Sequence, residues 1–273
     1  VFAMTTQPTT NLVALLHGPD HPGIVAKVSG WIFENSGNII HADQHRDQEE
    51  GVFFQRVEWS NESELPAAAV AQAFRDFADS VGMKAIVAVS DRQPKIALFV
   101  SKFDHCYHDL ILRWKAGEFA CDISLIISNH PDLQKTSEQY GIPFHHIPVT
   151  KETKPEAEAR QLALLQENDI QVVVLARYMQ VLTADFIDQF NRPVINIHHS
   201  FLPAFVGARP YHQAFRKGGK IIGATAHYVT ADLDQGPIIH QGVANVTHRH
   251  SIEAFIQKGR DLEKMTLSQA VRW

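Results

Sequence analysis

Strand-length apolar runs alternate with helix-length stretches from residue 95 to the end of the chain. The expected strands are Ile96–Val100, Cys121–Ile127 and Val172–Ala176, and the expected helices before or between them are Asp109–Ala116, Asp132–Tyr140 and Glu156–Glu167. Continuous apolar runs are typical of strands buried on both faces, and their alternation with helices is typical of parallel sheets. The sequence therefore predicts an α/β domain with a doubly wound, mostly parallel sheet over residues 95–273.

The chain before residue 90 has a different order of elements. Its expected strands are Leu12–Leu16, Ile39–His45, Val52–Glu58 and Met83–Val89, and its expected helices are Ile24–Ile32 and Pro66–Phe77. This order, βαββαβ, is that of a ferredoxin-like module. The polar run Ser90–Pro94 lacks apolar periodicity and is expected to be a linker. We therefore predict an N-terminal tail (1–10), a ferredoxin-like domain (11–89), a linker (90–94) and a second domain (95–273).

Composition narrows the classes of partner. The net charge of -5 provides no basic field for nucleic acid, and 45% hydrophobic with 20% charged residues is ordinary for a globular protein. We find neither an apolar run long enough to span a membrane nor a secretory leader, and the two cysteines do not form a CxxC pair. We therefore expect a cytoplasmic protein that binds neither nucleic acid nor membranes.

Histidine is abundant, with sixteen residues in the chain. Three histidine clusters stand out, at His145–His146, at His198–His199 and at His248 with His250. None of them has the HExxH or Cys/His spacing of a zinc site. We expect no metal and no cofactor.

The segment Val194–Gln241 concentrates side chains that can carry chemistry. Asn196 and His198 end an expected strand, Pro193–Ile197, at the edge where open α/β sheets bind ligands, and alternation along the strand puts both side chains on one face. Asp234 follows in a Leu-Asp-Gln-Gly-Pro turn. The competing interpretation is that all three are turn formers without chemistry.

Two motifs in this segment carry a family resemblance. They are Asn-Ile-His-His-Ser-Phe-Leu-Pro, at residues 196–203, and Leu-Asp-Gln-Gly-Pro, at residues 233–237. Both resemble the signature of the folate-dependent formyltransferase family, in which Asn, His and Asp act on a formyl group carried by N10 of tetrahydrofolate. The resemblance is strongest to the members of that family that hydrolyse the formyl group. It implies the formyltransferase fold for residues 95–273 and 10-formyltetrahydrofolate as the substrate.

The resemblance also implies roles for individual residues. Asn196 would donate to the oxyanion, His198 would transfer protons, and Asp234 would order the attacking water and favour the charged form of the imidazole. His227 is either a helper at this site or a structural residue. The folate would be bound by Tyr178, Met179, Gln180, Val181, Leu182, Thr230, Ala231, Asp232 and Leu233. Met179, Val181 and Leu182 fit a plain core equally well.

The run Ser101–Asp109 bears on the acceptor of the formyl group. Ribotide-transferring relatives open this domain with a glycine-rich loop that binds the acceptor's phosphate, whereas this run contains no glycine and carries Asp104 and Asp109. We therefore expect water as the acceptor, giving formate and tetrahydrofolate. The resemblance implies that this formate supplies purine synthesis and that the reaction balances the one-carbon folate pool. Two alternatives are an enzyme that transfers the formyl group to an amine and a non-catalytic protein that senses an amino acid.

The first domain carries a second resemblance. A loop is expected at His17–Gly23, and the run Gly-Pro-Asp-His-Pro-Gly-Ile-Val that opens the first helix resembles ACT domains, which are small regulatory modules. The resemblance implies a homodimer or homotetramer and an amino-acid effector such as glycine or methionine. The effector would bind at Asp20, His21, Pro22, Gly23 and Ile24. The alternative is a domain that only joins subunits.

The C-terminal segment Ile252–Val271 has the periodicity of an amphipathic helix. The residues expected on its buried face are Ile252, Phe255, Ile256, Met265 and Leu267. The resemblance implies that family members continue past Trp273.

Overall fold

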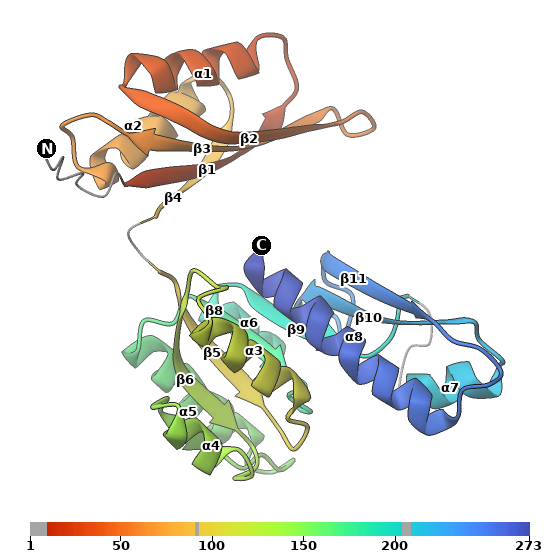
Figure 1. The fold of residues 1–273 in the computed structure, drawn as a ribbon. Coiled ribbons are helices and arrows are strands. Elements are labelled where there is room, and N and C mark those ends of the chain that lie inside the picture. The colour runs from red at the N-terminus through yellow and green to blue at the C-terminus, as the bar shows by residue number, and fades with distance from the viewer. Residues whose placement is uncertain (1–9, 91–92, 204–208) are drawn as a thin grey trace, which may run out of the picture. The chain divides into compact units, whose positions relative to one another are not determined.

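The computed structural model describes residues 10–90, 93–203 and 209–273 (Figure 1). Most of the expected tail, residues 1–9, and residues 91–92 of the expected linker lie outside these ranges. The chain divides into two compact units, Val1–Gln93 and Pro94–Trp273. No helix in the described ranges is both long enough and apolar enough to cross a membrane.

The first unit is a four-stranded antiparallel sheet with two helices. Its elements are β1 (Asn11–Pro19), α1 (Ile24–Glu34), β2 (Gly37–Asp47), β3 (Val52–Asn61), α2 (Ala67–Ser80) and β4 (Lys84–Val89). The strand order is β2-β3-β1-β4, which with this connectivity is the ferredoxin-like topology. Leu12, Ala14 and Leu16 alternate into the core that the helices cover.

One expected boundary in this unit is wrong. The loop predicted to begin at His17 begins later, because β1 continues to Pro19. His17, Gly18 and Pro19 pair with Phe54, Phe53 and Val52 of β3. Glycine and proline favour turns, but here their pairing with β3 outweighs that local preference and keeps them in the strand.

The second unit contains a seven-stranded sheet. Its strands are β5 (Lys95–Val100), β6 (Asp122–Ser128), β7 (Phe144–His146), β8 (Val172–Ala176), β9 (Val194–His198), β10 (Ile221–Tyr228) and β11 (Ile238–Asn245). Their order is β11-β10-β9-β8-β5-β6-β7. The strands β9, β8, β5, β6 and β7 are parallel, whereas β10 and β11 add antiparallel. The predicted α/β fold with a mostly parallel sheet is confirmed, and the order reverses between β5 and β8, where such sheets bind ligands.

Helices cover both faces of this sheet (Figure 1). They are α3 (His105–Lys115), α4 (Gln134–Gln139), α5 (Lys154–Glu167), α6 (Ala184–Phe190), α7 (Pro210–Arg216) and α8 (Ile252–Arg272). Ile96, Leu98 and Val100 of β5 pack with α3 and α8, whereas Ala97 and Phe99 pack with α5 and α6. This alternation explains why the strand is apolar throughout.

Two expectations for the helices are wrong. Helix α3 begins at His105 and not at Asp109, because no glycine or proline between them delays it. Met265, expected on the buried face of α8, is 63% exposed. It lies two positions before the buried Leu267, which is about 200° around a helix, so it faces away from the core.

Candidate active site

The pairing of β9 with β10 brings the side chains of Asn196, His198 and His227 together. Asn196 lies opposite His227 in the register of the two strands, and His198 lies opposite Thr225. Thr225 Oγ1 donates to the Ser200 carbonyl and accepts from the Leu202 amide, which holds the turn after β9. The pairing of β9 with β10 therefore determines where the side chain of Asn196 lies.

Asp234 reaches the same place from the loop that joins β10 to β11. The amide of Tyr228 donates to the Pro237 carbonyl at 2.9 Å, so the loop folds back on the end of β10. A Cβ atom on Gly236 would collide with the Tyr228 carbonyl oxygen. Asp234 itself has a left-handed backbone, with φ of 57°. Glycine at position 236 therefore allows the loop to present Asp234 to β9.

The polar groups form one connected network. Asp234 Oδ2 lies 3.2 Å from His198 Nδ1, and Asp234 Oδ1 lies 3.5 Å from His227 Nε2. His227 Nδ1 donates to the Tyr228 carbonyl at 2.9 Å, which assigns the proton of a neutral ring to Nδ1. The amide of Asn196 then donates to His227 Nε2 at 3.2 Å. His227 thereby orients Asn196, whose second amide hydrogen has no partner in the part of the chain that the structure describes and can serve a ligand.

Charge and burial prepare two of these groups for chemistry. The hydrogen bond from His198 is the largest cause that holds the pKa of the Asp234 carboxyl well below its usual range, so the group stays ionised near neutral pH. His198 is buried, and its Nε2 has no hydrogen-bond partner among the described residues. With Nδ1 held by Asp234, the other nitrogen is available to a ligand.

These side chains line a cavity of about 320 Å³. Asn196, His198, His227 and Asp234 share its wall with the predicted folate residues Tyr178, Met179, Gln180, Val181, Leu182, Thr230, Ala231 and Leu233. Asp232 is not on this wall; its carbonyl accepts from Thr230 Oγ1 at 3.1 Å and shapes the loop. A slot of this size lined by apolar groups with a few convergent polar ones is typical of a small-molecule site.

The structure separates the two interpretations of the segment after β8. Met179 and Val181 are 49% and 54% exposed, so they belong to the cavity wall and not to the core. Tyr178 and Leu182 are buried in the core and also border the cavity. Only part of the segment is therefore core.

The segment after β8 is held by residues that sequence reasoning missed. Ser101 Oγ accepts from the Met179 amide at 2.9 Å and donates to Asn129 Oδ1 at 2.6 Å. Gln161 Nε2 donates to the Tyr178 hydroxyl at 3.0 Å. Ser101 and Asn129 follow the ends of β5 and β6, so their place at the carboxyl edge of the sheet was the available signal.

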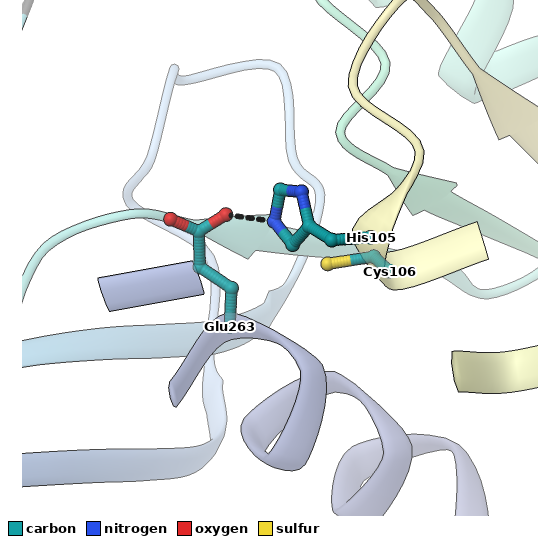
Figure 2. A group of neighbouring side chains, drawn as sticks. All are labelled: His105, Cys106 and Glu263. Carbon is teal, nitrogen blue, oxygen red and sulfur yellow. Dashed lines mark hydrogen bonds and ion pairs between the residues drawn. The ribbon is translucent and has the colours of Figure 1, made fainter. Parts of the chain in front are cut away.

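A second cluster lies on α3 and α8, with Glu263 of α8 beside His105 and Cys106 of α3 (Figure 2). Glu263 accepts from His105 Nε2 at 2.7 Å and from the Tyr211 hydroxyl at 2.6 Å. Burial raises its pKa, but the hydrogen bond from His105 and the charge of Arg177 outweigh burial and lower it. Burial and the nearby Glu263 raise the pKa of the Cys106 thiol well above its usual value.

The donors around Glu263 argue against a metal at this cluster. A metal ion would have to replace hydrogen bonds at both carboxylate oxygens, and it would need a thiolate where the thiol is favoured. The cluster is better described as a buried, hydrogen-bonded carboxylate.

The predicted effector residues of the first unit lie at the connection from β1 to α1, with Ile24 as the first residue of the helix. Gly23 has φ of 88° at the N-terminus of α1, and Ile24 is buried. Asp20 Oδ2 lies 2.6 Å from Arg46 Nε, and His21 Nε2 lies 3.2 Å from the Val81 carbonyl oxygen. Pro22 is exposed between them.

Comparisons with known proteins show the family to which the chain is similar. Residues 94–271 match the family model described as formyl transferase. A formyltetrahydrofolate deformylase from Synechocystis sp. is 52% identical over 265 residues, which are 96% of this chain and 93% of the relative. The crystal structure of a formyltetrahydrofolate deformylase from Pseudomonas syringae pv. tomato is similar, with a TM-score of 0.93 at 42% identity, covering 98% of this chain and 90% of that one.

The transfer enzymes of the same fold are less similar. A phosphoribosylglycinamide formyltransferase from Bacillus halodurans has a TM-score of 0.61 at 29% identity, and covers 65% of this chain and 93% of its own. The similarity to the deformylases includes the first unit, whereas the similarity to this transferase covers about two thirds of the chain. The chain therefore belongs to the formyltetrahydrofolate deformylase family.

Proposed function

We propose that this chain hydrolyses 10-formyltetrahydrofolate to formate and tetrahydrofolate, and that Asn196, His198 and Asp234 carry the reaction. The observation that supports these roles most is that the three side chains share one cavity wall and one hydrogen-bond network that includes His227. Tyr178 to Leu182 and Thr230 to Leu233 would hold the folate in that cavity. The mechanism uses side chains alone, so we propose neither a metal nor a cofactor.

The reaction opens an N-formyl amide with water. Ionised Asp234 orients the water, whose oxygen adds to the formyl carbon while Asn196 donates to the developing oxyanion. The His198 cation then protonates N10 as the bond between the formyl carbon and N10 breaks. Asp234 accepts the proton that the attacking water loses and later releases it to solvent, and the formic acid product returns a proton to Nε2 of His198 as it becomes formate. The products are formate, tetrahydrofolate and one proton.

The start of α3 supports water as the acceptor. Asp104 occupies the N-cap of this helix, where the backbone amides would otherwise attract an anion. Asp109, in the second turn of the same helix, forms an ion pair with Arg113, with 2.9 Å between Asp109 Oδ2 and Arg113 Nε. A phosphate dianion would meet the Asp104 carboxylate, so a phosphorylated amine is disfavoured.

The test is an incubation with 10-formyltetrahydrofolate in the absence of any amine. We expect formate and tetrahydrofolate in equal amounts, and added glycinamide ribonucleotide should not divert the formyl group. Capture of the formyl group by that amine would favour the transferase alternative, and no turnover at all would favour the sensor alternative.

The cellular role and location are also proposals. We propose that the formate supplies purine synthesis and that hydrolysis balances the one-carbon folate pool, as the family resemblance implies. We place the chain in the cytoplasm because Cys106 and Cys121 are free thiols, which is typical of a reducing compartment.

We propose further that the first unit is an ACT-type regulatory domain that forms a homodimer or homotetramer and binds an amino acid such as glycine or methionine. The ferredoxin-like strand order supports this, as does the loop at Asp20–Gly23 that opens α1. Among the described residues no side chain caps the start of α1, so its amides can receive a carboxylate. A unit that only joins subunits is the alternative.

A further inference from the structure

A second cavity of about 380 Å³ adjoins the folate cavity. Arg177, Met179 and His199 line both, so these residues form the partition between them. The ring of His199 lies 5.3 Å from that of His198 on one side and 6.2 Å from that of Tyr211 on the other. The second cavity thus begins directly behind the imidazole that we assign to proton transfer.

The second cavity is rich in positive charge. Three arginines line it, Arg177, Arg209 and Arg260, against one carboxylate, that of Glu263. Glu263 neutralises part of this charge, since Arg177 Nε lies 3.3 Å from its Oε2. Arg209 and Arg260 have no ion pair with any residue in the described ranges, so an excess of cationic groups faces the cavity.

One buried donor in this wall has an ion-pair neighbour but no hydrogen bond. Arg177 is 9% exposed, and its Nε is within ion-pair distance of Glu263 but has no hydrogen-bond partner among the described residues. A buried donor that lacks a hydrogen bond is costly, and a small anion could accept from it. The neighbouring His199 adds a neutral donor, because burial and the charge of Arg177 lower its pKa to about 4.

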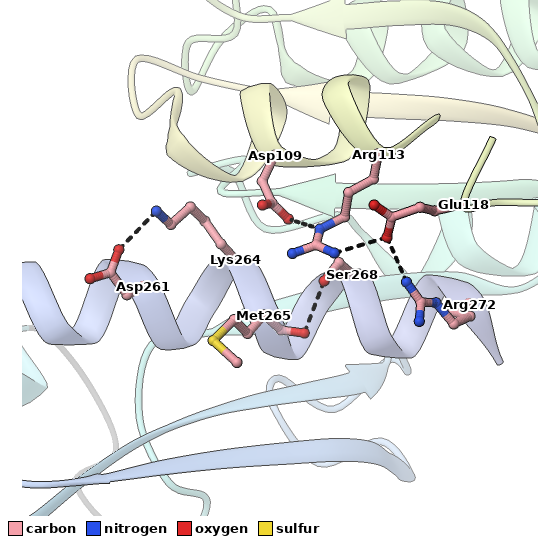
Figure 3. Close-up of polar contacts among 8 residues, drawn as sticks. All are labelled: Asp109, Arg113, Glu118, Asp261, Lys264, Met265, Ser268 and Arg272. Atoms are coloured by element: carbon pink, nitrogen blue, oxygen red, sulfur yellow. Dashed lines mark hydrogen bonds and ion pairs between the residues drawn. The ribbon is translucent and has the colours of Figure 1, made fainter. Parts of the chain in front are cut away.

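The helix that forms part of this wall packs against its neighbours. Helix α8, which carries Arg260 and Glu263, is linked to α3 by Glu118, which accepts from Arg113 at 2.9 Å and from Arg272 at 2.7 Å (Figure 3). Tyr211 packs on Gly259 of α8, where a Cβ atom would collide with the ring. The cationic groups are therefore held by elements that pack on the main sheet.

We propose that the second cavity is a binding site for a small carboxylate, and that it receives the formate product. This proposal rests on the proposed deformylase activity. The formyl amide is neutral, and hydrolysis turns its carbon into an anion beside Arg177 and His199. Tetrahydrofolate still fills the first cavity at that moment, so the cationic cavity offers formate a favourable place to move.

Binding to the folate-free protein tests the site directly. Sodium formate should bind in calorimetric titrations, whereas formamide, which is neutral and of similar shape, should bind at least tenfold more weakly, with sodium chloride keeping the ionic strength constant. We expect Arg260→Gln to weaken formate binding about threefold and the double variant Arg209→Gln/Arg260→Gln to weaken it more. Lys258→Gln removes the same charge from α8 outside the cavity and should bind formate normally.

The outcomes separate the two proposals. Formate that binds no better than formamide, or equally well to the double variant, would overturn the carboxylate site. In turnover assays formate should inhibit without competing with 10-formyltetrahydrofolate, and the double variant should need more formate for the same inhibition. Arginine-dependent formate binding without any folate hydrolysis would support the site and refute the proposed activity.

Discussion

At the scale of single residues, the active-site argument depends most on Asp234. Its lowered pKa means that it stays ionised from mild acid upward, and it would lose its charge only at pH values below the usual range of a carboxyl. A loss of activity in mildly acidic buffer would therefore come from another group. The same ionised carboxylate holds His198 Nδ1, and Nε2 has no hydrogen-bond partner among the described residues.

Asp234→Asn keeps the shape of the side chain and removes its charge. We expect kcat to fall by about two or more powers of ten with KM little changed, because the loss falls on the transition state. Steady-state kinetics with 10-formyltetrahydrofolate measure this. Asp188→Asn, at an exposed carboxylate on α6, is the matched control and should retain normal rates. Near-normal turnover by Asp234→Asn would remove Asp234 from the mechanism.

His227 is expected to act through Asn196. His227→Leu removes the acceptor that orients the Asn196 amide, so kcat should fall about tenfold, a loss of roughly one hydrogen bond's worth of stabilisation. His227→Gln can still offer an acceptor oxygen and should recover part of the rate. Equal rates for the two variants would mean that His227 acts only through packing.

The sequence predicted the residues of this site unevenly. Asn196, His198 and Asp234 stand in motifs with fixed spacing, and the structure brings them together. Ser101, Asn129 and Glu263 could not be assigned in the same way, since they contact the site region through partners far along the chain. Ser101 and Asn129 follow strand ends, which marks them as candidates, but no local pattern records which residues they pair with.

At the scale of elements, the loop between β10 and β11 determines where Asp234 lies. Gly236→Ala would place a methyl group against the Tyr228 carbonyl and push the loop off β10. We expect activity to fall about a hundredfold with only modest loss of thermal stability, because the loop lies outside the main core. Gly30→Ala, at a helix position with no neighbouring atoms in reach of the added carbon, is the control. Full activity of Gly236→Ala would show that the loop tolerates displacement.

Strands that are apolar throughout and helices with a clear period were predictable, whereas some short or paired elements were not. Residues 172–176 are apolar throughout and form β8. The short helices α6 and α7 span too few residues to show a helical period, and β11 depends on pairing with β10. The early start of α3 and the outward Met265 were missed because burial is decided by packing as well as by spacing.

At the scale of the whole molecule, the first unit is expected to regulate the second. Each unit has its own buried core, so a chain lacking residues 1–93 can be tested beside the intact chain. One amino acid in a panel that includes glycine and methionine should change the rate or melting temperature of the intact chain only. Coupling of this kind is typically worth about 1 to 3 kcal/mol. If no amino acid has an effect, the first unit is a scaffold.

The origin of the oxygen in formate tests the central claim most directly. Turnover of 10-formyltetrahydrofolate in water enriched in oxygen-18, without any amine, should give formate that carries one labelled oxygen per molecule, because water attacks the formyl carbon. Mass spectrometry of the released formate reads this out. Formate without the label, or a formyl group that leaves the folate only when an amine is added, would contradict the hydrolytic mechanism.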